Sequence, residues 1–509
     1  MAGRMEENLN DLRNFVAEVK KAGIRHVVHM GMGGSSLAPL VLKETFPSTR
    51  DGLDLTILDT TDPATIQRVD QANPPAETLY IVASKSGTTS EPLAFGEYFY
   101  NHVKGIKGSR AGENFIAITD PGSPLVELAR KRGFHRVFLN FPDIGGRFSA
   151  LTYFGLVPAA LYGLDIGELL VRALRMQHAC VPSVPAAENP GLVLGASLGE
   201  LARLGRDKVT FLAPEPISSL GMWLEQLLAE STGKEGSGLL PVSGEPLGPP
   251  STYGQDRLFV HFRLADEPDQ NLERGVKALQ AAGQPVITIR LADRMDLGQE
   301  FFRWEIATAV AGSILGINAF DQPNVQENKD NTHRLLDYFS QHHQLSDEAP
   351  SLQADPLSLR TSEPDSTVDK TLKKFFLRAR PGDYIALLPY LTEDPAIDQA
   401  LMPIRLCVRD HLHLATTIGY GPRYLHSAGQ YHKGGANTGV FLLITANTHI
   451  DVPIPDKAYS FSVFNRAQAL GDLETLRHHK RRVILLGLGS DIKEGLSALN
   501  IAIETALSG

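Results

Sequence analysis

The chain has 509 residues, more than a single hydrophobic core normally organises, so we expect two to four domains. Hydrophobic residues make up 42% and charged residues 21% of the sequence, values that are typical of a globular protein. The formal net charge of −9 argues against a nucleic-acid partner, and it means that a phosphorylated ligand needs a locally built anion site.

Two further features indicate a cytoplasmic protein. The two cysteines, Cys180 and Cys407, lie far apart and outside any metal-binding or redox spacing, which suits a reducing compartment and argues against disulfides. The N-terminus is polar, and the longest apolar runs, such as residues 440–444, have the length of a strand. We therefore expect neither a signal peptide nor a membrane span.

Strand-like runs alternate with helix-compatible segments over the first third of the chain. A helix to about Lys21 is followed by apolar runs at Arg25–Met30, 53–59, 78–84, 114–120 and 135–140. This alternation is typical of a parallel sheet that helices cover on both faces. We expect a first doubly wound α/β domain over residues 1–170, which ends in an apolar helical bridge.

The same pattern then occurs twice more. Runs at 208–214, 257–263 and 284–290 predict a second domain over residues 171–340. Residues 341–370 are rich in Ser, Asp, Pro and Gln and predict a linker or an exposed insertion. A third α/β domain over residues 371–509 is predicted from runs at 383–391, 439–445 and 481–489, and from a helical pattern over Ala467–His478.

A glycine-rich motif, Gly31-Met-Gly-Gly-Ser-Ser36, follows the first predicted strand. Glycines at Gly33 and Gly34 allow a backbone to approach a ligand closely, and they open a helix N-terminus beside Ser35. Dinucleotide-binding turns have the same pattern, and Asp59 ends the next strand where a ribose-binding acid can lie. This motif alone leaves a dinucleotide site and a plain tight turn open.

A second motif follows the run at 78–84 and concentrates hydroxyl groups. Ser84, Ser86, Thr88 and Thr89 surround one glycine just before a predicted helix. Hydroxyls and free backbone N–H groups hold a phosphate without a net positive patch. The Gly-Lys-Ser/Thr order of a P-loop is missing, and the alternative is a simple helix-capping cluster. We expect these four residues to bind a phosphate.

Taken together, GMGGSSLAP and SKSGTTSEP resemble the sugar-isomerase (SIS) fold, and specifically the glucose-6-phosphate isomerase family. Further segments carry the same resemblance: IGGRFS at 144–149, WLEQLLAESTGK at 223–234, and FDQPNVQENK at 320–329. These five motifs occur in the family's order. Residues from about 375 onward resemble the carboxyl-terminal part of bifunctional transaldolase/glucose-6-phosphate isomerases, for example in GPRYLHSAGQYHKGG.

The resemblance implies two SIS-type doubly wound parallel-sheet domains followed by a C-terminal α/β domain. It also implies reversible isomerisation of glucose 6-phosphate and fructose 6-phosphate through an enediolate, a reaction of glycolysis and gluconeogenesis that needs no cofactor and no metal. The implied partners are the sugar phosphate, without nucleic acid or membrane, and a second copy in a homodimer. Gly33, Gly34 and Ser35 are then expected to bind substrate.

The family's catalytic roles carry over to three residues of this sequence. Glu230, in the ESTGK segment, corresponds to the proton-transfer base, and a carboxylate suits that task when it is placed against the carbon and partly desolvated. Arg147, in GGRFS, is expected to stabilise the enediolate oxygens. Lys329 is expected to reach the ring oxygen or the polar end of the substrate.

The ring-opening group departs from the family pattern. The family has a histidine shortly after the glutamate of ESxGK, whereas residues 250–257 read PSTYGQDR without one. His432, in the glycine-bounded segment 429–435, is the candidate that we choose, because histidine exchanges protons near neutral pH. A purely structural His432 is an equally open alternative, with ring opening by a subunit neighbour, Lys329 or water.

Other functions remain open at this stage. A non-catalytic SIS regulator that binds sugar phosphates needs the hydroxyl loop but neither Glu230 nor Arg147. A dual phosphoglucose/phosphomannose isomerase differs by only one or two pocket residues. A glutamine-dependent aminotransferase needs a glutaminase cysteine, and neither cysteine has such a setting. A dehydrogenase explains the first glycine motif alone.

Overall fold

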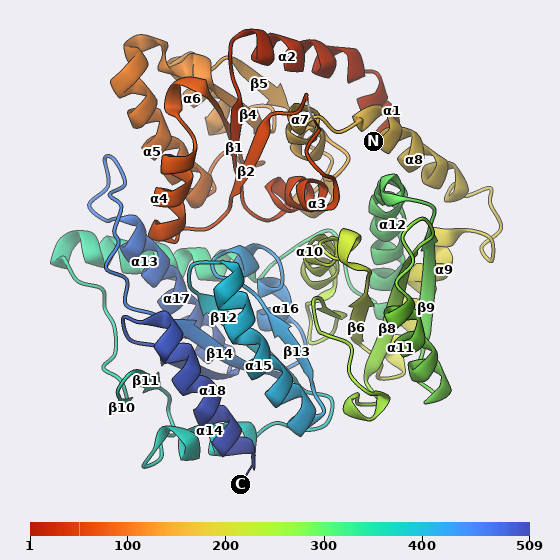
Figure 1. The fold of residues 1–509 in the computed structure, drawn as a ribbon, viewed down its shortest axis with the longest axis vertical. Coiled ribbons are helices and arrows are strands. Elements are labelled where there is room, and N and C mark those ends of the chain that lie inside the picture. Colours follow the sequence, from red (N-terminus) through yellow and green to blue (C-terminus); the bar gives the residue numbers. More distant parts are fainter. Residues whose placement is uncertain (50, 509) are drawn as a thin grey trace.

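The computed structural model describes residues 1–49 and 51–508, and its ribbon forms three α/β units that each surround one sheet (Figure 1). We call residues 2–179 unit 1, residues 190–315 unit 2 and residues 352–508 unit 3. Figure 1 shows unit 1 above the other two units, which lie side by side below it. The predicted fold class, α/β with parallel sheets, is confirmed.

Unit 1 has a five-stranded parallel sheet in the order β2-β1-β3-β4-β5. Its strands coincide with the predicted runs and are β1 (His26–Met30), β2 (Asp54–Leu58), β3 (Thr78–Ala83), β4 (Phe115–Thr119) and β5 (Arg136–Leu139). Its helices are α1 (Ala2–Glu6), α2 (Leu9–Lys21), α3 (Leu37–Thr45), α4 (Pro63–Ala72), α5 (Ser90–Lys107), α6 (Pro124–Arg132), α7 (Tyr153–Tyr162) and α8 (Ile166–Ala179).

Unit 2 has a four-stranded parallel sheet in the order β7-β6-β8-β9. Its strands are β6 (Lys208–Leu212), β7 (Leu240–Val242), β8 (Arg257–Leu264) and β9 (Val286–Leu291), and its helices are α9 (Pro190–Arg203), α10 (Leu220–Thr232), α11 (Gln270–Ala281) and α12 (Leu297–Leu315). The sequence pattern missed β7, because three residues are too few to establish a period of two. Helix α13 (Val325–His342) then leads toward unit 3.

Unit 3 has a six-stranded sheet in the order β10-β11-β15-β14-β12-β13. Strands β12 (Tyr384–Tyr390), β13 (Ala415–Ile418), β14 (Gly439–Thr445) and β15 (Arg482–Gly487) are parallel, and β10 (Leu352–Ala354) and β11 (Leu357–Arg360) add an antiparallel edge. The helices are α14 (Val368–Phe376), α15 (Pro395–Leu412), α16 (Gly429–Gly434), α17 (Phe461–His478) and α18 (Ile492–Ser508). The segment 341–370, predicted as a linker or insertion, thus contains two strands of this sheet.

The parallel strands of all three units share one spatial order. When the strands of a unit are counted along the chain, the first strand lies between the second and the third. In such sheets ligands bind outside the carboxyl ends of the strands, at the point between the first and third strands where the winding direction reverses. In unit 1 this point lies between β1 and β3, which the glycine motif and the hydroxyl motif follow directly.

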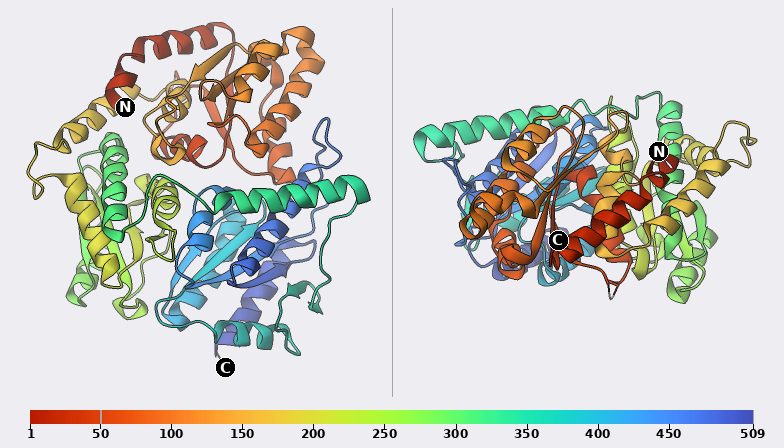
Figure 2. Two further views of the ribbon diagram at one scale, coloured as in Figure 1. Left: turned by 180° about the vertical axis from the view of Figure 1, so that it is seen from behind. Right: turned by 90° about the horizontal axis from the view of Figure 1, so that it is seen from above.

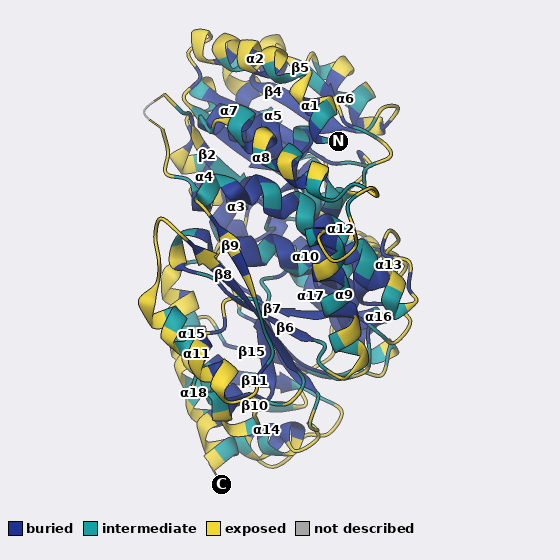
Figure 3. Cartoon of the chain, turned by 90° about the vertical axis from the view of Figure 1, so that its right-hand side faces the viewer, coloured by how far each residue is buried: buried dark blue, intermediate teal, exposed yellow. Residues whose placement is uncertain are grey.

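Unit 1 shares its apolar core with both other units. Successive side chains of a strand point to opposite faces of the sheet. Along β3, Leu79 and Ile81 belong to a buried cluster that continues into unit 2, and Tyr80 and Val82 belong to one that continues into unit 3. Figure 3 shows the strands as buried and the exposed residues on the outer helices. The three units therefore pack as one body around unit 1.

Polar contacts join the carboxyl edge of unit 1 to that of unit 3. Arg423, in the short helix after β13, binds Asp59 at the end of β2 with Nε and Nη2, at 2.7 and 2.8 Å. Thr61 donates to Gln468 of α17 over 2.7 Å. Seen from behind, α13 lies across the boundary between these two units (Figure 2). Ligand-binding edges of two units thus face each other.

Candidate functional site

The hydroxyl loop of unit 1 opens into a pocket at this boundary. Thr88 and Thr89 line the pocket, whose cavity volume is about 200 Å³. Ser84 donates to the Thr89 hydroxyl over 3.0 Å, and the hydroxyls of Ser86 and Thr88 lie 2.9 Å apart. Gly87 has a φ of +68°, which favours glycine at the turn. Ser84 and Ser86 therefore orient the two hydroxyls that face the cavity.

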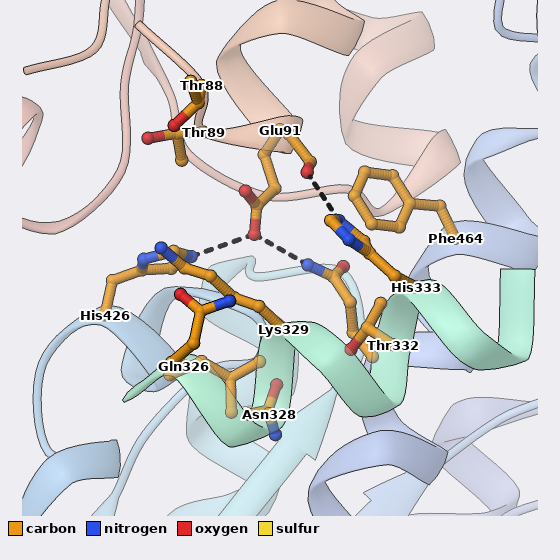
Figure 4. A pocket seen from close by; sticks show the side chains of 13 residues that line it. Thr88, Thr89, Glu91, Gln326, Asn328, Lys329, Thr332, His333, His426 and Phe464 are labelled. Carbon is orange, nitrogen blue, oxygen red and sulfur yellow. Dashed lines mark hydrogen bonds and ion pairs between the residues drawn. The ribbon is translucent and has the colours of Figure 1, made fainter. Parts of the chain in front are cut away.

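The pocket is lined by residues of unit 1, of α13 and of unit 3 (Figure 4). Figure 4 shows Thr88 and Thr89 on one side and Gln326, Lys329 and His333 of α13 with His426 of unit 3 around the rest. The full lining is Thr88, Thr89, Ser90, Glu91, Gln326, Asn328, Lys329, Thr332, His333, Leu425, His426, Phe464 and Gln468. The predicted Lys329 is thus placed beside the predicted hydroxyl loop.

Glu91 is the acceptor at the centre of this pocket. His426 Nε2 lies 2.9 Å from Glu91 Oε1, and Gln468 Nε2 donates to the same oxygen over 2.8 Å. Burial by itself would raise the pKa of Glu91. The charge and hydrogen bond of His426 and the charge of Lys329 outweigh burial, so the pKa of this carboxyl is lowered. Glu91 is therefore a carboxylate at neutral pH and holds the His426 ring in one orientation.

Glu230 and Arg147 meet at the adjoining end of α10. Arg147 Nη1 lies 3.3 Å from Glu230 Oε1, and the arginine side chain is only 3% exposed. Its other donors are held by Ser231 Oγ and Gln322 Oε1 and by backbone oxygens of residues 319 and 321. Burial lowers the pKa of Arg147 and Glu230 opposes that shift, so the guanidinium remains a fixed positive charge.

Gln226 connects this ion pair to the pocket. Its Nε2 donates to Glu230 Oε2 and to the backbone oxygen of His426, each over 2.9 Å. Gln226 lies one helical turn before Glu230, so both side chains project from the same face of α10. The carboxylate of Glu230 is therefore two hydrogen bonds away from the histidine that lines the cavity beside Thr88.

The sequence of this chain is similar to those of known proteins. Residues 4–244 match the model of the phosphoglucose isomerase family. A glucose-6-phosphate isomerase of Rubrobacter xylanophilus is 29% identical over 381 residues, which cover 64% of this chain and 86% of the relative. One from Synechococcus sp. is 31% identical over 59% of this chain and 64% of its own length.

Two solved structures resemble the fold of this chain. The hypothetical protein TT0462 of Thermus thermophilus aligns with a TM-score of 0.57 and 27% identity, over 65% of this chain and 88% of its own. A glucose-6-phosphate isomerase of Chlamydia trachomatis aligns with a TM-score of 0.55 and 23% identity, over 66% of this chain and 74% of its own. Among the described residues, no helix is long and apolar enough to cross a membrane.

The family match ends before unit 3, although unit 3 completes the pocket. Residue 244 lies in unit 2, and His426, Phe464 and Gln468 come from unit 3. Glu91, Gln226, His426 and Gln468 were not predicted as site residues from the sequence. Three of them stand inside motifs quoted above, Glu91 in SKSGTTSEP, Gln226 in WLEQLLAESTGK and His426 in GPRYLHSAGQYHKGG, and Gln468 lies in the helical pattern over Ala467–His478. Their positions inside these segments were the only indication in the sequence that these residues belong to the site.

His432, the histidine expected to open the ring, lies elsewhere. Its Nδ1 is 2.9 Å from the hydroxyl of Tyr384, and its ring packs against Tyr384, Tyr424 and Phe441. Burial lowers its pKa to about 3, so this imidazole is neutral. His432 is 3% exposed and does not line the pocket, so in the structure it is a core residue of unit 3.

The glycine motif also has a different setting from the one expected. A Cβ on Gly33 would lie 2.6 Å from the His426 backbone oxygen, and one on Gly34 would lie 2.2 Å from the Gly146 backbone. Both glycines thus let neighbouring segments approach, and they contact protein rather than the cavity. Ser35 is buried, and its backbone oxygen accepts a hydrogen bond from the buried ring of His29.

Proposed function

We propose that this chain catalyses the reversible isomerisation of glucose 6-phosphate and fructose 6-phosphate through an enediolate, with Glu230 as the base. One observation carries the proposal. Glu230 pairs with the buried Arg147 and is linked through Gln226 to His426, which lines the cavity beside the hydroxyl loop. The match of residues 4–244 to the phosphoglucose isomerase family model and the names of relatives at about 29% identity support the same reaction.

The substrate phosphate is proposed to bind at residues 84–89. Thr88 and Thr89 offer hydroxyls to the cavity, and Ser84 and Ser86 orient them. The first N–H groups of the 18-residue helix α5 have no partner within the helix, and the helix dipole adds a partial positive charge there. This arrangement suits a dianion on a protein whose net charge is negative.

Ring opening is proposed to use His426 in place of His432. Because Glu91 accepts from Nε2, the other ring nitrogen of His426 is left to take the proton of the anomeric hydroxyl and pass it to the ring oxygen. Lys329 lines the same cavity and adds positive charge beside these oxygens. The transfer consumes no net proton, so the histidine is ready for the reverse reaction.

Proton transfer between the carbons is proposed to use Glu230. The carboxylate takes the C2 proton of the open aldose, and the electron pair moves to form the enediolate. The guanidinium of Arg147 then stabilises the negative oxygen. Because five protein acceptors fix this guanidinium in position, the side chain needs little reorganisation when the charge develops. Return of the same proton to C1, with transfer of the C2 hydroxyl proton to the C1 oxygen, gives the ketose.

We further propose that the chain is cytoplasmic and forms a homodimer. The two free cysteines suit a reducing compartment, and the homodimer rests on the family resemblance alone. Three parts of one chain already line the pocket, so activity is not expected to depend on the partner. Light scattering of the purified chain measures its mass, and an active monomer would contradict the dimer without contradicting the reaction.

The test is turnover by the purified full chain. Fructose 6-phosphate is incubated with the protein in the presence of a chelator, and glucose 6-phosphate is then measured with a dehydrogenase in a separate step. We expect product to form at a rate proportional to the chain concentration. Binding of fructose 6-phosphate by folded protein without turnover would contradict the proposal and favour the regulator. Mannose 6-phosphate in a parallel reaction tests the dual isomerase.

A further inference from the structure

Outside the pocket, two imidazoles and a carboxylate from two helices converge. Glu327 lies in the first turn of α13, His478 is the last residue of α17 and His479 follows it. Glu327 Oε1 is 2.6 Å from His478 Nδ1, and Oε2 is 2.7 Å from His479 Nε2. One donor atom from each residue lies within 4.8 Å of the other two.

This set of side chains suits a transition-metal ion. Two imidazole nitrogens and one carboxylate oxygen are ligands that zinc prefers, with a water in the fourth position. With bonds of about 2.1 Å, tetrahedral ligand atoms lie roughly 3.4 Å apart. Each of the two carboxylate–imidazole contacts therefore has to widen by less than about 1 Å, and the two imidazole nitrogens lie within 4.8 Å of each other. The side chains of Glu327, His478 and His479 are 30%, 76% and 26% exposed, which leaves the ion a path from solvent.

The three residues join two helices that both reach the pocket. Helices α13 and α17 pack against each other, with hydrogen bonds from Asn328 to Asp472 and from Asn331 to Thr475. Lys329 projects from α13 into the cavity, and on α17 Phe464 and Gln468 line it. A link between the ends of these helices therefore acts on the frame that carries the pocket.

We propose that Glu327, His478 and His479 bind one divalent transition-metal ion of the zinc class, which ties α13 to α17. The ion replaces the two direct contacts between the carboxylate and the imidazoles, and any imidazole proton is released to solvent. The bound ion stabilises the helix pair and restrains Lys329. The ion takes no direct part in the chemistry of the proposed isomerisation, and the test of the site does not depend on turnover.

The experiment uses untagged full-length chain, stripped of metal with a chelator and dialysed. Zinc binding is measured by calorimetry and by competition with a chromophoric chelator, and cobalt binding is followed by its visible absorption. We expect one equivalent bound with micromolar or tighter Kd, the absorption of a four-coordinate cobalt ion, and a rise in Tm of about 2 °C or more at a hundredfold excess of zinc over Kd.

Two variants and a matched control assign the site. H478Q/H479Q and, separately, E327Q are expected to weaken zinc binding at least about tenfold and to lose the rise in Tm, with unchanged circular dichroism. The control H342Q/H343N removes the adjacent exposed histidines at the end of α13 and should bind zinc within twofold of the parent. Absence of stoichiometric binding by the parent would overturn the proposal, and so would equal affinity in H478Q/H479Q.

Discussion

Units 1 and 3 have the same order of parallel strands, yet they bring different chemistry to the pocket. Unit 1 contributes hydroxyls at Thr88 and Thr89 and the helix N-terminus behind them. Unit 3 contributes the imidazole of His426 and the amide of Gln468, both bound to the one carboxylate at Glu91. The strand order determines where a ligand edge lies, and the loop residues decide what that edge does.

A second difference concerns the way each unit is joined to its neighbours. Unit 3 meets unit 1 through a buried ion pair and hydrogen bonds at the carboxyl edges, and also through a shared apolar cluster. Unit 2 contributes Glu230 and Gln226 from a single helix that reaches this boundary. The comparison thus predicts three separable roles: anchoring by unit 1, ring opening by unit 3 and proton transfer by unit 2.

The largest effect is expected when the proton-transfer base is removed. Glu230→Gln keeps the shape and loses the basicity, so kcat should fall by about 10²- to 10⁴-fold with a small change in KM. Loss of exchange of the C2 hydrogen with solvent should accompany it. The control is Glu225→Gln on the same helix, whose carboxyl accepts from Ser427 and does not pair with Arg147, and this variant should stay within twofold of the parent. Parent-like exchange in the Glu230 variant would remove this residue from its role.

Breaking the ion pair between the edges should cost the most stability. Arg423→Gln leaves Asp59, 2% exposed, without its bidentate partner, and this should lower the free energy of unfolding by about 3–5 kcal/mol. Adding Asp59→Asn in the same chain should recover much of that loss. Urea unfolding at pH 7 measures both, and Arg130→Gln, in an exposed pair with Glu127, is the control. If the Arg423 variant were as stable as this control, the ion pair with Asp59 would not be what stabilises the contact between units 1 and 3.

Comparing two histidines of unit 3 separates chemistry from packing. His426→Gln should lower kcat on the cyclic substrate by about 100-fold, with Tm nearly unchanged and a smaller loss on the open-chain form. His432→Gln should lower Tm while kcat of the folded fraction is retained, because His432 packs among aromatic rings. Steady-state kinetics and thermal unfolding of the two variants distinguish the roles. The opposite assignment of the two effects would restore His432 as the ring-opening group.

The junction of units 2 and 3 should make stability depend on pH. Burial raises the pKa of Glu225 to about 7, although Ser427 donates to this carboxyl. The folded chain then binds the proton more tightly than the unfolded chain, so this contribution is present below pH 4.5 and is lost as pH rises to 7. Glu225→Gln should therefore stabilise the protein by about 2–3 kcal/mol at pH 8 and by little at pH 4.5. Equal effects at both pH values would contradict the shift.

The smallest effect is expected in the hydroxyl loop of unit 1. Thr88→Val removes one hydrogen bond to the phosphate and keeps the side-chain volume, so KM should rise about tenfold with little change in kcat. The inhibition constant of inorganic phosphate, acting as a competitive inhibitor, should rise by a similar factor. Thr505→Val, on the exposed face of α18, is the matched control and should leave both values unchanged. A fall in kcat alone would mean that Thr88 acts in the chemistry.

Several features of the candidate site were predictable because they depend on local sequence. Runs of buried residues such as 78–83 predict strands, and the glycine and hydroxyl motifs come directly after two neighbouring strands of a parallel sheet. Glu230 and Arg147 were chosen by resemblance and lie together. The short strands β7 and β13 were missed, since too few residues form each to establish a period.

The sequence by itself determined the three α/β units and the loops at the sheet edges, because strand and helix periods and glycine positions are properties of neighbouring residues. The candidate base came from the resemblance of the ESTGK segment to that of the glucose-6-phosphate isomerase family. Only the tertiary structure decided which histidine faces the cavity. His426 and His432 stand six positions apart, and the packing of their segment against β12, β14 and the glycine at 33 turns one ring to Glu91 and the other into the core. Contacts between units separate in the sequence set that choice.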